Sequence, residues 1–409
     1  MTTPRWGIFL LLTVLILGSV PGASGAPAPA SVSGENRYGV LFTAWIRPGD
    51  PLATVRIRLT KNAEFVRWMR LSAASPKYSA FKGSGSITQE ADGLLWHPSG
   101  ERPWLQYTVN LESKRESGRF DGLVTADWAI FRADDLVPPV HIDMADGTRS
   151  ASKLSLELPT GWSAATPFPP YKSGRFRIDN DDRRFDRPTG WVALGKLGIR
   201  RERINATRLT IAAPTGQGVR RMDTLAFFRG TLPTLQSVFP EFPERLLVVS
   251  AGDPMWRGAL SGPDSLFVHA DRPLISENGT STFVHELVHV AMRARSRPDS
   301  DWIVEGLAEY YSLEVLHRSG MLGDARFEKA HAGLAAWGAE APTLAVAHST
   351  GPVTAKAVGV LRAIDRDIRS ASKGKKSLDD VARALAAANE PVTRAGFDAL
   401  VAAAKKGAD

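Results

Sequence analysis

The sequence has no cysteine and few of the side chains that bind metals or carry protons: its 409 residues include eight histidines and six tyrosines. Without cysteine, disulfides cannot stabilise the fold, and a metal would have to be held by histidine, aspartate or glutamate. A chain of this length can bury enough apolar surface to fold without disulfides, and it exceeds what one hydrophobic core usually organises. We therefore expect at least two domains, and any cluster of histidines is informative.

Long hydrophobic runs are also lacking, except at the N-terminus. The opening, "MTTPRWGIFLLLTVLILGSVPGASGAPAPA", has a basic residue, a short apolar run and then small residues suited to cleavage. It predicts a signal peptide over residues 1–25 and a Pro/Ala/Ser linker over residues 26–36, with an uncleaved N-terminal membrane anchor as the alternative. Because no later segment could cross a bilayer, we expect a periplasmic or secreted protein without a stable membrane span after signal cleavage.

A basic stripe that alternates with aromatic residues is a third absence. The formal net charge is +8, but basic segments such as "RIR", "RRERINATR" and "RARSR" are spread along the chain, and no basic stripe alternates with aromatic side chains. Nucleic-acid binding is therefore not expected. A solvated basic surface is the simpler interpretation.

The pattern of elements changes along the chain. Residues 37–195 contain alternating segments such as "ATVRIRL" and "KLSLEL" separated by turn clusters, which predicts an all-β, sandwich-like domain. Residues 196–409 begin with strands at "ATRLTIAA", "RLLVVSA" and "SLFVHA" and a helix at "MDTLAFFRGTLPTLQSVF", and become helical after Asn278. The predicted class is α+β and multidomain. "SLFVHA" is either an edge strand that pairs with an extended peptide or a plain structural strand.

The stretch "FVHELVHVAMRARS", residues 283–296, places two histidines and a glutamate in an apolar run. Apolar residues on almost every side predict a helix packed inside a domain. His285 and His289 are four residues apart, so both rings project from one face, and Glu286 points beside them. Two core histidines satisfied by backbone carbonyls are the alternative, but the H-E-x-x-H spacing favours a metal site.

A third metal ligand must come from elsewhere, because catalytic zinc usually has three protein ligands and an open position for water. The next predicted helix, "SDWIVEGLAEYYSLEVLHRSG", offers Glu305 and Glu309, which share a face. The connecting "RARSRPDS" is short enough to make the two helices neighbours. Sequence spacing alone does not choose between the two glutamates.

These residues resemble the gluzincin zinc metallopeptidases, whose third ligand is the glutamate of a Trp-x-x-Glu-Gly-x-Ala-x-Tyr segment, here "WIVEGLAEYY". The resemblance implies that Zn²⁺ is held by His285, His289 and Glu305. From about residue 40 to 390, text such as "DWAIFRADDLVPP", "LSLELPTGWSAATPF" and "IDNDDRRFDRPTG" is similar in particular to the glycyl aminopeptidase family. This likeness implies a thermolysin-like catalytic domain after the N-terminal β domain.

The resemblance also implies roles for two further carboxylates. Glu286 would act as the general base that takes a proton from a zinc-bound water, and a peptide or protein would be the substrate. Glu309 would lie one turn beyond Glu305 and accept an imidazole N–H, which fixes the ring that binds metal. A salt bridge to a nearby arginine is the alternative for Glu309.

Two departures from the family concern substrate binding and chain length. The stretch that should hold a substrate's free amine, a Gly-x-Met-Glu-Asn type of segment, corresponds to "RGALSGPDSLF", with Ser261 and Gly262 in place of the acid and its neighbour. Strict aminopeptidase action is therefore not expected. The family often appends a C-terminal peptide-binding PDZ domain, and we expect none here because the chain ends in "VAAAKKGAD".

A third departure concerns the oxyanion-stabilising tyrosine of the family. Its segment reads "TAKA" at residues 354–357, and no tyrosine follows Tyr311. His331 and His348 lie in the right part of the chain to replace it, and ordinary packing or surface histidines are the alternative. The sequence thus predicts an exported zinc-dependent metallopeptidase. The other hypotheses are a weakly active or inactive envelope scaffold that keeps the fold, or cleavage of a non-peptide amide.

Overall fold

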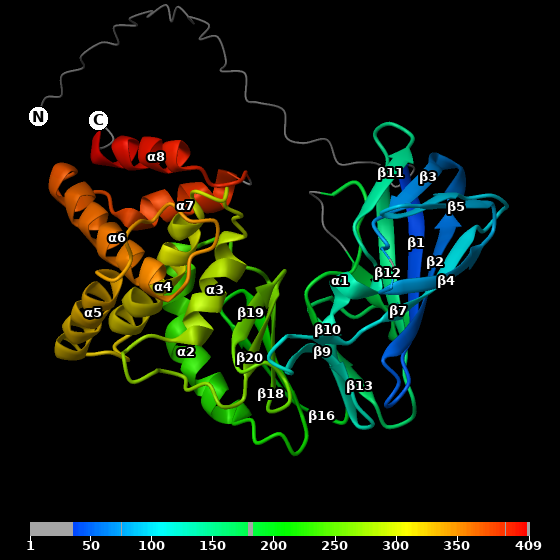
Figure 1. Ribbon diagram of the computed structural model, residues 1–409, viewed down its shortest axis with the longest axis horizontal. Helices are drawn as coiled ribbons and strands as arrows, with labels where there is room; N and C mark the ends of the chain where they lie inside the picture. The colour runs from blue at the N-terminus through cyan, green and yellow to red at the C-terminus, as the bar shows by residue number, and fades with distance from the viewer. Residues whose placement is uncertain (1–35, 75, 179–182, 389, 407–409) are drawn as a thin grey trace, which may run out of the picture. The chain divides into compact units, whose positions relative to one another are not determined.

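A computed structural model describes residues 36–74, 76–178, 183–388 and 390–406, and Figure 1 shows the arrangement of its elements. The predicted signal peptide and all but the last residue of the predicted linker lie outside these residues. Arg37–Asp409 form one compact unit, which combines many strands with helices. The mixed α/β class expected from the sequence is confirmed.

Three sheets make up the N-terminal part of this unit. The first, in order, is β14 (Phe176–Ile178), β12 (Arg149–Glu157), β1 (Arg37–Trp45), β2 (Leu52–Lys61), β7 (Trp104–Asn110) and β4 (Tyr78–Gly83). The second is β13 (Ser163–Ala165), β15 (Trp191–Gly195), β10 (Trp128–Arg132), β9 (Phe120–Val124) and β8 (Ser113–Lys114). The third is β11 (Val140–Met144), β3 (Val66–Leu71), β6 (Gly93–His97) and β5 (Ser86–Glu90). A single helical turn, α1 (Ala133–Leu136), follows β10.

Alternating side chains explain why β2 is a strand with one buried face, whereas all five residues of β15 are buried. In β2, Val55, Ile57 and Leu59 are fully buried, whereas Arg56 lies at the surface between Trp45 and Trp104. The buried side chains of all three sheets contribute to one hydrophobic core. A period of two in the sequence therefore becomes one face turned to the core and one to solvent.

A fourth sheet carries the second part of the unit, in the order β16 (Leu197–Ile204), β17 (Thr207–Pro214), β18 (Arg245–Ala251), β20 (Ser265–His269) and β19 (Ala259–Gly262). β20 pairs with β18 in parallel and with β19 antiparallel, and all its residues are buried. The expectation that "SLFVHA" is an edge strand is therefore wrong, because β19 occupies the edge. In the described part of the chain, β19 lies against the histidine-bearing helix.

The remaining elements are helices that cover this sheet and one another (Figure 1). They are α2 (Arg221–Val238), α3 (Thr282–Met292), α4 (Asp301–Arg318), α5 (Asp324–Gly338), α6 (Gly351–Ala371), α7 (Leu378–Ala388) and α8 (Arg394–Lys406). Their apolar side chains form a second core with β17, β18 and β20. Among the described residues, none of these helices has the length and apolar character needed to span a membrane.

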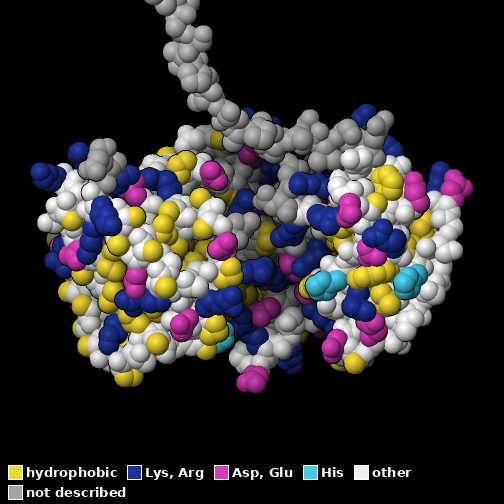
Figure 2. All heavy atoms as spheres, turned by 90° about the horizontal axis from the view of Figure 1, so that it is seen from above, with side chains coloured by type: hydrophobic (Ala, Val, Ile, Leu, Met, Phe, Trp, Pro, Cys, Tyr) yellow, Lys and Arg dark blue, Asp and Glu magenta, His cyan; other side chains and the backbone are white. Residues whose placement is uncertain are grey.

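Charge is spread over the described surface, as expected from the sequence. In Figure 2, acidic side chains are scattered, while several lysine and arginine side chains lie toward the middle of the face shown. The described residues form ion pairs along the whole chain, from Arg67–Asp143 to Lys405–Asp367.

Candidate metal centre

Helix α3 is held firmly at both ends. At its start, the Ser281 side chain accepts a hydrogen bond from the Val284 N–H, and Ser281 N–H donates to the hydroxyl of Ser312 in α4 at 2.7 Å. At its end, Arg293 adopts a left-handed conformation with φ of 50°, and its N–H bonds to the carbonyl of His289. These caps satisfy backbone groups that the helix would otherwise leave unpaired. They also tie α3 directly to α4.

Packing turns the two histidines of α3 toward one side. Val284, Leu287 and Val288 are fully buried, while the side chains of His285 and His289 are 17% and 16% exposed. The helix predicted from the apolar run is therefore confirmed, and its least buried face carries both imidazoles. Residues four apart on a helix share a face, which brings their rings together.

Helix α4 brings a carboxylate to this face. Gly306 is the residue on which α6 packs, because a side chain there would place its Cβ 2.7 Å from the Cβ of Ala357. The neighbouring Glu305 points at the histidines: its Oε2 lies 3.4 Å from His285 Nε2 and its Oε1 lies 3.4 Å from His289 Nε2. The absence of a side chain at Gly306 thus allows the close helix contact beside Glu305.

The three side chains form the group of possible metal ligands found in the described residues, with donor atoms that all lie within 4.8 Å of one another. The two Nε2 atoms of His285 and His289 are 3.2 Å apart. Ligands bound tetrahedrally to zinc at about 2.0–2.1 Å stand roughly 3.3 Å from each other. The donor set and its spacing therefore fit zinc.

The charges of the cluster favour a cation between its members. Burial opposes a charge on His285, but hydrogen bonds to Glu305 and Glu309 raise its pKa well above the usual value. Burial also opposes a charge on Glu305, and contact with His285 and His289 nevertheless lowers its pKa below the usual value. Carboxylates thus face imidazoles across a small space, an arrangement in which a divalent ion would replace protons.

Two further carboxylates surround the cluster. Glu309 Oε2 accepts a hydrogen bond from His285 Nδ1 at 2.9 Å, which leaves His285 Nε2 directed at Glu305. Glu309 therefore contacts the His285 imidazole, which is the contact that the first of its two hypotheses requires. Within the described residues, no ion pair joins Glu309 to an arginine, which the second hypothesis requires. Glu286 is 8% exposed and projects from α3 next to His285.

The structure does not bring His331 to the cluster. In α5 its ring packs edge-on against Phe327, which stacks on His317 near the end of α4. His317 follows Glu305 by twelve residues on the same helix, which corresponds to roughly 18 Å. A role for His331 at the reacting carbonyl therefore has no support from its position.

His331 instead predicts a pH dependence of stability. Burial, together with the nearby Arg362, lowers its pKa from 6.5 to about 4, and its Nε2 has no hydrogen-bond partner in the described residues. The folded state favours the neutral ring, so this contribution to stability is complete above about pH 6.5 and falls as the pH drops toward 4. We expect His331 to cost roughly 2 kcal/mol of unfolding free energy between pH 7.5 and pH 5.

Urea unfolding of the wild type and His331→Leu at these two pH values measures this cost. The variant is expected to lose less stability on acidification than the wild type, whereas the exposed control His97→Leu should follow the wild type. Equal pH dependence of all three proteins would show that His331 is not held neutral.

His348 lies closer to the cluster, on an exposed loop before α6. The backbone N–H of the next residue, Ser349, donates to Asp301 Oδ2 at 2.7 Å. Asp301 begins α4 one turn before Glu305, and its other oxygen accepts from Ser296 in the loop after α3. The Asp301 carboxylate thus ties the loop after α3 and the loop before α6 to the N-terminal end of α4, one turn from Glu305. Tyr310 and Tyr311 are buried in the core.

The edge strand β19 carries Ser261 and Gly262, where the resemblance would put an acid. The carbonyl of Ser261 accepts a hydrogen bond from Arg132 of β10 at 3.2 Å, and the Trp191 indole N–H donates to the carbonyl of Leu260 at 2.8 Å. Sequence reasoning missed Arg132, because its contact joins residues 129 positions apart and leaves no local signal. Arg132 also lies 3.6 Å from the Asp134 carboxylate, so an arginine with its own acidic partner contacts this end of the strand, and β19 itself contributes no acid there.

Comparison with known proteins establishes the fold. No family model matches the chain, and no curated protein matches it. The structure of the aminopeptidase N family protein from Idiomarina loihiensis is similar at a TM-score of 0.64 and 16% identity, over 85% of this chain and 70% of that one. The M1 zinc metallopeptidase from Deinococcus radiodurans is similar at a TM-score of 0.58 and 18% identity, over 91% of this chain and 92% of that one. A mutant of that metallopeptidase gives a TM-score of 0.59. The chain therefore has the fold of these proteins.

Proposed function

We propose that the protein is a zinc-dependent metallopeptidase in which His285, His289 and Glu305 hold the metal. The convergence of their donor atoms at 3.2–3.4 Å is the observation that carries this proposal. The fold shared with an M1 zinc metallopeptidase supports it. A peptide or protein is then the expected substrate.

When held by these residues, zinc would lower the pKa of a coordinated water toward about 7 and would polarise a carbonyl oxygen. Glu286 neighbours His285 on α3 and is nearly buried, so its carboxylate would take a proton from the attacking water and pass it to the leaving amine. Glu309 holds His285 Nδ1 and thereby fixes the ring with Nε2 directed at the metal position. His348, on the loop tied to Asp301, is the side chain we propose to stabilise the oxyanion.

The enzyme is proposed not to be a strict aminopeptidase. A free amine needs a carboxylate partner, and β19 offers Ser261 with Arg132 on its carbonyl. Asp134 is the nearby carboxylate, and it is already paired with Arg132 at 3.6 Å and with Arg187 at 3.6 Å. We also propose export to the periplasm or out of the cell, on the basis of the N-terminal signal sequence.

Matched peptides with a free and an acetylated N-terminus test the proposal. We expect the wild type to cleave both at internal bonds, and 1,10-phenanthroline to abolish cleavage until zinc is added back. Removal of single residues from the free peptide alone would identify an aminopeptidase. No cleavage of either peptide by zinc-loaded protein would favour the second candidate function, an envelope scaffold that keeps the fold and the metal. The observation that favours this second candidate is that no tyrosine follows Tyr311 in the sequence to stabilise the oxyanion.

A further inference from the structure

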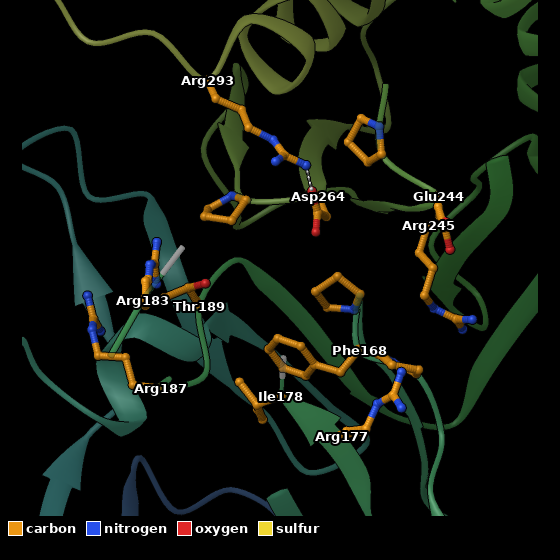
Figure 3. Close-up of a pocket in the computed structure, with 14 residues that line it drawn as sticks. Phe168, Arg177, Ile178, Arg183, Arg187, Thr189, Glu244, Arg245, Asp264 and Arg293 are labelled. Carbon is orange, nitrogen blue, oxygen red and sulfur yellow. Dashed lines mark hydrogen bonds and ion pairs between the residues drawn. The ribbon is translucent and has the colours of Figure 1, made fainter. Parts of the chain in front are cut away.

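A cavity of about 230 Å³ lies at the C-terminal end of β19. Figure 3 shows Asp264 and Arg293 on one side of it, and Phe168, Ile178 and Arg177 on the opposite side. Five arginines and two acidic residues line it: Arg177, Arg183, Arg187, Arg245, Arg293, Glu244 and Asp264. Its walls therefore carry an excess of positive charge.

Two of the five arginines, Arg183 and Arg245, form no ion pair within the described residues, although the charge of Arg183 acts on the nearby Asp264. Among the described residues, no hydrogen bond or ion pair satisfies the side chain of Arg183, which is half-buried. Arg245 Nε is buried without a hydrogen-bond partner. Burial, followed by repulsion from Arg208 and Arg201, lowers the pKa of Arg245. Unpaired guanidinium groups in a recess cost free energy that a bound anion would recover.

Neither Asp264 nor Glu244 forms an ion pair with Arg183 or Arg245 within the described residues. Arg293 Nη2 lies 3.1 Å from Asp264 Oδ1, so one carboxylate is already matched with one arginine. Arg187 reaches the Asp134 carboxylate at 3.6 Å and donates to the carbonyl of Val137, and it too is held by the protein. Arg183 and Arg245 therefore remain as the guanidinium groups available to a ligand.

The cavity adjoins the metal centre along two elements. Arg293 follows His289 by four residues on α3, about 6 Å along the helix. Asp264 follows the last residue of β19 by two positions, and its contact with Arg293 places the ends of β19 and α3 side by side. An extended peptide that pairs with the free edge of β19 would pass the zinc ligands and then reach this cavity.

We propose that the arginine-lined cavity binds a carboxylate side chain of an extended peptide, two or three residues from the bond that is cleaved. About 6 Å along the chain between His289 and Arg293, at roughly 3.3 Å for each extended residue, sets a minimum of about two residues, and the recess beyond Arg293 adds to it. Planar guanidinium groups suit carboxylates because they can donate two parallel hydrogen bonds. The proposal rests on the proposed function, since it assigns the cavity to the substrate of the same site.

Binding of matched peptides separates this inference from turnover. The zinc-loaded Glu286→Gln variant is titrated with fluorescent, acetylated and amidated peptides that carry one glutamate or one glutamine, placed at each position in turn. We expect the glutamate peptide to bind about tenfold tighter than its glutamine counterpart when the charge is in one register. Equal binding of the glutamate and glutamine peptides at every position would overturn the proposal.

Charge reversal assigns the preference to the cavity. Arg183→Glu, added to the same protein, is expected to abolish or reverse the preference for glutamate, and Arg183→Ala to weaken it. The control Arg47→Glu makes the same charge change at an exposed turn residue outside the lining and should leave the preference intact. A preference that survives Arg183→Glu, or one that appears only when the peptide has a free terminal carboxylate, would contradict the assignment.

Cleavage of the same peptides by the wild type tells the two ideas apart. A glutamate preference in binding without any hydrolysis would defeat the proposed peptidase activity and keep the acidic-peptide site. Hydrolysis with no difference between the glutamate and glutamine peptides, in binding or in cleavage, would support the proposed peptidase activity and overturn the acidic-peptide site.

Discussion

Replacing Glu286 with glutamine is expected to lower kcat/KM for peptide hydrolysis by about a thousandfold, the scale typical of losing a general base. Glutamine keeps the size of the side chain, which is 8% exposed, so the fold and the zinc ligands should be unaffected. Only the capacity to take a proton is removed. Kinetics with internally quenched peptides, combined with zinc analysis of the same preparations, measure both properties.

The control for this substitution is Glu340→Gln, the same chemical change at an exposed residue after α5. Its kcat/KM should stay close to that of the wild type. Equal activity of Glu286→Gln and the wild type would mean that hydrolysis, if observed, does not proceed through Glu286.

Replacing His289 with alanine is expected to weaken zinc binding by more than about a hundredfold. Removal of a carboxylate that only supports a ligand costs about 10- to 100-fold in zinc affinity, and loss of the ligand itself should cost more. Glu309→Gln provides this graded comparison, because its contact at 2.9 Å is with His285 and not with the metal position. Competition with a chromophoric chelator gives the three affinities.

Thermal unfolding provides a second measure of the same site. Zinc that binds only the folded protein stabilises it in proportion to the logarithm of its concentration. The Tm of the wild type should therefore rise with added zinc, and the Tm of His289→Ala should not. The exposed control His97→Ala should behave as the wild type. A zinc affinity of His289→Ala equal to that of the wild type would exclude this histidine from the site.

Local patterns in the sequence predicted the elements that carry the site. The apolar run around His285 and His289 predicted the buried α3, and the periodicity of β2 predicted its buried face. Ser377 stands just before α7, and its hydroxyl accepts a hydrogen bond from the Asp379 N–H. Such features depend on residues a few positions apart, which makes them readable from the chain alone.

Contacts between distant segments could not be predicted in the same way. The edge position of β19 depends on the pairing of β20 with β18, which the composition of "SLFVHA" does not encode. Arg132 reaches Ser261 from another sheet, and the arginine cavity combines residues from six separate stretches of sequence. The position of Glu309 against His285 likewise depends on the packing of α3 against α4.

Domain boundaries and destination remain predictions. The boundary expected between residues 195 and 196 falls at the junction of β15 and β16, where the strands of two sheets follow each other directly. The signal sequence lies outside the described residues. Both depend on properties, such as independent folding and cleavage by a signal peptidase, that need experiments on the protein.

Zinc content is the measurement that tests the central claim most directly. Residues 26–409, purified and dialysed against metal-free buffer, are analysed by mass spectrometry for zinc, with and without prior reconstitution. About one zinc per chain is the expected result, because two imidazoles and one carboxylate at 3.2–3.4 Å match tetrahedral zinc. No zinc even after reconstitution would contradict the proposed metal centre and leave His285 and His289 as packing residues of α3.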